Sequence, residues 1–218
     1  MAIGESKMTR LNMPYYAQSA EFTCGPACVL MVVKHLEPGR RIDRSLEFEV
    51  WRQCNMIGIR GADPYGLSVP LMSAGYEVRL LTQRRQAINA VQWRHRLRRR
   101  FSRDEVELSL FGMRQNRARA LKLRLRVTLK RPTVSDILQA LVEGYVPIVL
   151  VHMGVVHSLD IPHWVVVTAA DHKMVRFNDP YPPRGRKGIT LPHSKFQKII
   201  DDIGTRTGFS PSVLFVRA

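Results

Sequence analysis

Cys24 is a candidate for thiol chemistry because of where it stands in the chain. It follows Thr23, a residue type favoured at helix N-caps, and it opens an apolar run that extends to Val33. We therefore expect Cys24 at the N-terminus of a central helix. The unpaired N–H groups and the dipole of a helix N-terminus favour a thiolate and lower the pKa of the thiol.

His163 and Asp179 are the candidate partners of this thiol. His163 directly precedes a strand pattern at residues 164–167, and its imidazole can accept the thiol proton and later protonate a leaving amine. Asp179 ends the next predicted strand of the same hairpin, so it should lie near His163 and orient its ring. The alternatives are a core histidine at 163, an ordinary turn at Asp179-Pro180, and His157 as a rival base.

Gln18 lies six residues before Cys24, and we expect its side-chain amide to stabilise an oxyanion together with the backbone N–H of Cys24. A solvated loop residue is the alternative for Gln18. For Cys24 the alternatives are a small buried hydrophobe or, with Cys28 on the same helix face, a zinc ligand, although no second ligand pair follows. We expect Cys28 and Cys54 to be unreactive, and neither a metal nor an organic cofactor to be needed.

The elements needed to position these residues indicate an α+β fold, with an N-terminal helical part carrying Cys24 and a C-terminal antiparallel sheet carrying His163 and Asp179. A chain of 218 residues suits a single domain, 1–218. The patterns predict helices near residues 24–36, 45–53, 68–74, 133–143 and 194–202, and strands near residues 76–81, 146–153, 164–169, 174–177 and 212–217.

A basic segment, Arg84 to Arg131, separates the two parts. It holds sixteen Arg or Lys residues against three acidic ones, so it carries +13 of the net charge of +16. We expect an insertion that is either a solvated face or a docking surface for an acidic protein, a lipid surface or nucleic acid. Alternating apolar residues at 106–110 and 121–129 predict a β-hairpin, with a helix over 113–125 as the alternative.

The motifs Gln18-x5-Cys24-Gly25-x-Ala27-Cys28, His163-Trp164-Val165-Val166-Val167 and Asn178-Asp179-Pro180 together resemble the double-glycine leader peptidase family. That family is papain-like, and its best-known members form the N-terminal part of transporters that export and trim bacteriocins. The resemblance covers about residues 12–36, 66–80 and 133–180, and the chain is most similar to the free-standing relatives. It implies a Cys24-His163-Asp179 triad and an oxyanion amide at Gln18.

The function predicted from these residues is thiol-dependent acyl transfer on a peptide or amide substrate by a cysteine peptidase, amidase or transpeptidase. The alternative is a catalytically weak papain-like scaffold that binds an acidic partner or nucleic acid through Arg84 to Arg131. No apolar run approaches the roughly 20 residues of a transmembrane helix, and no signal peptide is readable. Three cysteines in no evident pairing pattern suit a reducing compartment, so we expect a cytoplasmic protein.

Overall fold

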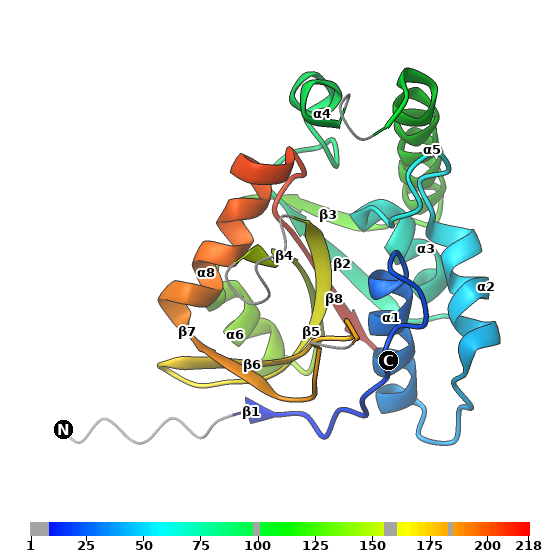
Figure 1. Cartoon of the computed structure of the whole chain (residues 1–218). Coiled ribbons are helices and arrows are strands. Elements are labelled where there is room, and N and C mark those ends of the chain that lie inside the picture. Colours follow the sequence, from blue (N-terminus) through cyan, green and yellow to red (C-terminus); the bar gives the residue numbers. More distant parts are fainter. Residues whose placement is uncertain (1–8, 98–100, 155–160, 183–184) are drawn as a thin grey trace.

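A mixed β-sheet lies at the centre of the computed structural model, which describes residues 9–97, 101–154, 161–182 and 185–218 (Figure 1). The strands follow the order β3-β2-β8-β4-β5-β6-β7, and β1 pairs with β5. The pairing of β2 with β3 is parallel, and the other pairings are antiparallel. The strands are β1 (Thr9–Arg10), β2 (Glu77–Thr82), β3 (Arg126–Leu129), β4 (Val146–His152), β5 (Pro162–Ala170), β6 (Met174–Asn178), β7 (Ile189–Pro192) and β8 (Ser212–Arg217).

Helices cover both faces of this sheet (Figure 1). In β5, Val166 packs in the apolar cluster that includes α1 and α3, whereas Val165 and Val167 pack in the cluster that includes α6 and α8. This alternation is the one expected of a strand buried on both faces. The α+β fold class is confirmed. The helices are α1 (Cys24–Leu36), α2 (Arg44–Cys54), α3 (Pro64–Ser73), α4 (Ala90–Leu97), α5 (Arg103–Lys122), α6 (Val134–Val142) and α8 (His193–Asp202), and a π-helical turn, η1, covers Ile203–Thr207.

Helix α1 is central because it is apolar nearly all round, and it is buried from Gly25 to Val32. It begins at Cys24, as predicted. Thr23 occupies the N-cap position, but its hydroxyl donates to the carbonyl of Ala20 and does not cap the helix. Thr23 is thus the N-cap residue, as predicted, but its side chain leaves the first N–H groups of α1 to other acceptors.

Strands β5 and β6 form the predicted hairpin. Asp171 closes its turn by accepting hydrogen bonds from the backbone N–H groups of Lys173 (2.7 Å) and Met174 (2.8 Å). The start of β5 and the end of β6 therefore lie together at the other end of the hairpin, where Val166 pairs with Asn178. This end of the sheet carries His163 and Asp179.

The hairpin predicted within the basic segment was wrong, because residues 103–122 form one helix, α5. Ser102 and Glu105 make a reciprocal capping box that starts this helix. Its buried positions include Val106, Leu110 and Met113, which have helical spacing, and its composition is rich in helix formers. The alternation at its C-terminal side does become a strand, β3, which joins β2.

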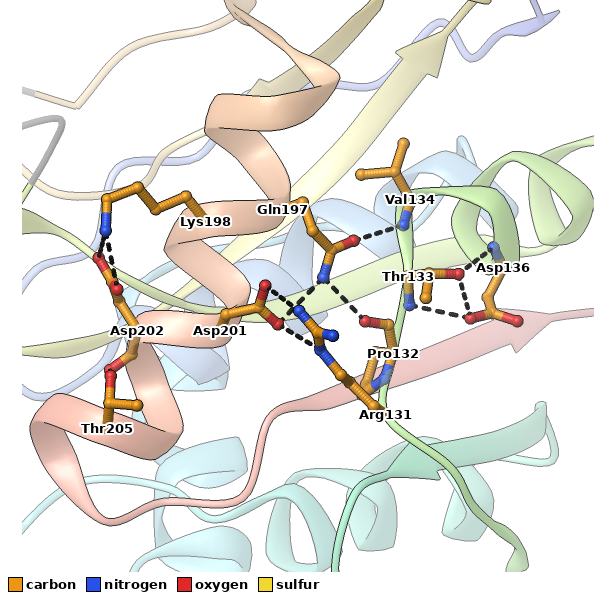
Figure 2. Close-up of polar contacts among 10 residues, drawn as sticks. All are labelled: Arg131, Pro132, Thr133, Val134, Asp136, Gln197, Lys198, Asp201, Asp202 and Thr205. Atoms are coloured by element: carbon orange, nitrogen blue, oxygen red, sulfur yellow. Dashed lines mark hydrogen bonds and ion pairs between the residues drawn. The ribbon is translucent and has the colours of Figure 1, made fainter.

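Both ends of the basic segment are attached to neighbouring elements. In α4, Trp93 is buried and packs edge-on against Phe209, with ring centroids 5.9 Å apart. At the other end, Arg131 forms an ion pair with Asp201 of α8, and Gln197 donates to the carbonyl of Pro132 (Figure 2). Part of the segment's charge is thus used in structural contacts.

Within the described part of the chain, the helices lack the length and apolar composition that a membrane span requires.

Candidate active site

Three of the predicted site residues lie in contact. His163 Nε2 is 2.7 Å from Asp179 Oδ1, so Nδ1 is the ring nitrogen left for its hydrogen bond with the Cys24 thiol. Asp179 is fully buried, His163 is 2% exposed and Cys24 is partly exposed. The arrangement excludes water from the pair of His163 and Asp179 behind the cysteine.

The Cys24 thiol and the His163 imidazole shift each other's pKa in opposite directions. Burial by itself raises the pKa of Cys24, but the charge and hydrogen bond of His163 and the backbone N–H groups of Trp164 and Gly25 bring it below the ordinary thiol value. Burial by itself lowers the pKa of His163, whereas the negative charge of Cys24 and the hydrogen bond to Asp179 raise it to about 10. Both shifts favour a thiolate beside an imidazolium.

Asp179 is held by contacts from three segments. Its Oδ1 accepts a hydrogen bond from the backbone N–H of Tyr181 (2.9 Å) as well as from His163, and its carbonyl accepts one from the Tyr15 hydroxyl (3.1 Å). The carboxylate is thus fixed as an acceptor for the ring. Asp171 lies at the far end of the hairpin, where it caps the turn, and the rival base His157 lies outside the described residues.

Gln18 is 2% exposed, so the alternative of a solvated loop residue is wrong. Its backbone N–H donates to the carbonyl of Pro180 (2.9 Å), which places it beside the residue that follows Asp179. Its Nε2 donates one hydrogen bond, to the carbonyl of Ala20 (2.8 Å), and its buried Oε1 has no partner within the described part of the chain. A second Nε2 hydrogen remains for another acceptor.

Glu47 holds the loop that carries Gln18, and the sequence analysis missed it. This carboxylate of α2 is fully buried and accepts hydrogen bonds from the Ser19 N–H (2.9 Å), the Ser19 hydroxyl (2.6 Å) and the Tyr16 hydroxyl (3.0 Å). Glu47 shares one face of α2 with buried Val50. A charged residue on the apolar stripe of an amphipathic helix was the signal that could have indicated this role.

Trp164 is packed in the core beside the nucleophile. It is 2% exposed, and its indole N–H donates to the carbonyl of Ala62 (3.0 Å). A Cβ on Gly25 would lie 3.2 Å from the Trp164 ring, so the glycine permits close approach of α1 and β5. This contact fixes the helix start against the strand that carries His163.

The other two cysteines differ from Cys24 in their surroundings. Cys28 and Cys54 are fully buried, and burial raises the pKa of both thiols. All three cysteines are free of disulfides. In the described ranges, no group of three or more His, Cys, Asp or Glu side chains is arranged to hold a metal ion.

The comparisons with known proteins agree with this architecture. The architecture described above, together with the family match that follows, indicates a papain-like cysteine peptidase fold. Residues 13–200 match the family described as Peptidase_C39 like (DUF3335), and the chain belongs to that family. This match confirms the resemblance to double-glycine leader peptidases. No curated protein matches the chain.

Two solved structures are similar at low identity. One is a double glycine motif protease from an AMS/PCAT transporter in complex with the leader peptide, which is 13% identical with a TM-score of 0.48 over 96% of this chain and 94% of that chain. The other is the peptidase domain of Streptococcus ComA, a bifunctional ABC transporter of a quorum sensing pathway. It is 16% identical with a TM-score of 0.47 over 92% of this chain and 95% of that chain.

Proposed function

We propose that this protein is a cysteine peptidase or amide hydrolase that transfers an acyl group from a peptide or amide to Cys24. The observation that carries the proposal is the buried His163, which bonds to the Cys24 thiol through one ring nitrogen and to Asp179 through the other. This is the arrangement that activates a nucleophile with a base and orients the base with a third group.

In the acylation step, the Cys24 thiolate attacks the carbonyl carbon, a C–S bond forms and the carbonyl oxygen becomes an oxyanion. The backbone N–H of Cys24 and the free Nε2 hydrogen of Gln18 donate to this oxygen. The imidazolium of His163 then protonates the amine as the C–N bond breaks, leaving a thioester. Neutral His163 next deprotonates water or an acceptor amine, whose attack releases the acyl group and restores the thiol.

Turnover of a peptide library tests this proposal. The purified protein is incubated with a mixture of unblocked and N-acetylated peptides, and new termini are identified by mass spectrometry. We expect products that disappear in Cys24→Ala and persist in Cys28→Ala, a matched control one helical turn away. Products that persist unchanged in Cys24→Ala would contradict the proposal.

We also propose that residues 84–131 are a basic insertion in a single papain-like domain, 1–218, and that helix α5 docks an acidic protein. The exposed apolar side chains Leu108 (48%) and Phe111 (47%) lie on a helix that also exposes Arg103 and Arg114. Apolar contacts inside a basic surface favour an acidic amphipathic partner over a purely solvated face.

The three free thiols support a cytoplasmic location.

A further inference from the structure

A basic hollow lies beside strands β1, β5 and β6, on the face of the sheet that packs against α1. It has a volume of about 280 Å³, just below the usual range of small-ligand sites. Three cationic residues line it, Arg10, Arg176 and Lys187, together with the polar residues Thr168 and Asn178.

The register of the strands brings two of these cations onto one face. Arg10 of β1 and Arg176 of β6 both pair with Ala169 of β5, one from each side. Directly opposed residues on neighbouring strands point to the same face, so the two guanidinium groups face one hollow from backbones about 10 Å apart. The separation suits a ligand held between them.

The charge of the hollow is not balanced. Its lining contains no carboxylate. In the described ranges, no ion pair involves Arg10, Arg176 or Lys187. Three like charges around one small space repel one another, and an anion placed between them would relieve that repulsion.

The backbone around Arg176 is shaped to hold its side chain. A Cβ at Gly188 would lie 2.5 Å from the Arg176 guanidinium, so only a glycine leaves room for the side chain there. The Gly188 N–H donates to Asn178 Oδ1 (2.9 Å), and the Thr168 hydroxyl donates to the Arg176 carbonyl (3.3 Å). Asn178 and Thr168 are 1% and 5% exposed, and through these hydrogen bonds they hold the backbone of the hollow's lining in place.

We propose that this hollow binds a phosphate group, either free or as the monoester of a small molecule. A phosphate dianion offsets more of the excess charge than a carboxylate does, and guanidinium groups match its oxygens with paired N–H donors. The site is separate from the chemistry at Cys24. Asn178 precedes Asp179 in the chain, but its side chain bonds to Gly188 and Pro14 and not to His163.

Isothermal titration calorimetry tests the proposal. The protein is titrated with inorganic phosphate and, separately, with O-phosphoserine at about pH 8 and constant ionic strength. We expect one saturable site per chain that binds at least one of these dianions more tightly than acetate. Tighter binding of O-phosphoserine would assign the monoester, and tighter binding of inorganic phosphate would assign the free ion. Acetate binding as tightly as both would overturn the proposal.

Charge-matched variants separate this site from the general basic character of the protein. Arg176→Gln and Lys187→Gln should each weaken phosphate binding by about tenfold. Arg52→Gln removes the same charge from the exposed side of helix α2 and should change the affinity by less than twofold. An equal loss in all three variants, or no saturable site in the unaltered protein, would overturn the inference.

Discussion

The substitution Asp179→Asn tests how the buried carboxylate controls the thiol. Asp179 raises the pKa of His163 through a 2.7 Å hydrogen bond between groups that are 2% exposed or less. A hydrogen bond to a charged group contributes about 1.5–3 kcal/mol, and one pKa unit corresponds to about 1.36 kcal/mol. Because the amide is neutral, we expect the pKa of His163 to fall by about one to two units and the pKa of Cys24 to rise as the imidazolium weakens.

Iodoacetamide alkylation of Cys24, followed by peptide mapping across pH, measures this change. In the unaltered protein the rate should rise with pH through a midpoint below the ordinary thiol pKa, because the thiolate is the reactive form. In Asp179→Asn the midpoint should move upward, and the rate below it should fall about tenfold. Asp171→Asn removes a carboxylate from the far turn and should leave the profile unchanged. Identical profiles for Asp179→Asn and the unaltered protein would refute this reasoning.

The remaining predictions concern turnover and docking. Gln18→Ala should lower turnover about 100-fold to 1,000-fold while Cys24 alkylation persists, and equal turnover would remove the amide from the oxyanion site. Glu47→Gln should lower turnover with little effect on Cys24 alkylation, because the substitution weakens the hydrogen bonds that hold the loop carrying Gln18. Glu49→Gln, on the exposed side of α2, is the control in the same kinetic assay. The double variant Lys122→Glu, Arg124→Glu should weaken salt-dependent capture of an acidic partner in pull-down experiments and leave turnover of a small substrate intact. Loss of that turnover in a folded protein would place the basic segment in the active site.

Much of the architecture was predictable because its local signals agree with its long-range packing. Thr133 caps α6 through a capping box, and Gly144 follows that helix with a positive φ of 80°. Continuous apolar runs mark β4 and β5, which are buried on both faces. The hairpin of β5 and β6 then places the residues at its open end together, and this geometry was sufficient to predict the contact between His163 and Asp179.

The basic segment was mispredicted because two periodicities coincide in it. Val106, Leu108 and Leu110 alternate as a strand would, yet in the structure Leu108 is 48% exposed while Val106 and Leu110 are buried on one side of a helix. The preceding Ser102 with Glu105 favoured a helix start, and that signal outweighs a short alternation. Burial against α3 and α4 then decides between the two patterns.

The supporting contacts of the candidate site depend on distances that a sequence does not contain. Glu47 is close to Ser19 only because α2 folds back against the loop before α1. The hydrogen bond from the Trp164 backbone to the Cys24 thiol requires the packing of β5 against Gly25. Such contacts follow from tertiary packing of separate elements, so motif spacing alone could not indicate them.

Trapping the acyl-enzyme tests the central claim most directly. The protein is mixed with a peptide found to be a substrate, quenched in acid within one turnover, digested and analysed by mass spectrometry. The proposed mechanism predicts the acyl group of that peptide as a thioester on Cys24, absent in Cys24→Ala and present in Cys28→Ala. Continued turnover with an acyl group on another residue, or by the Cys24→Ala protein, would contradict it.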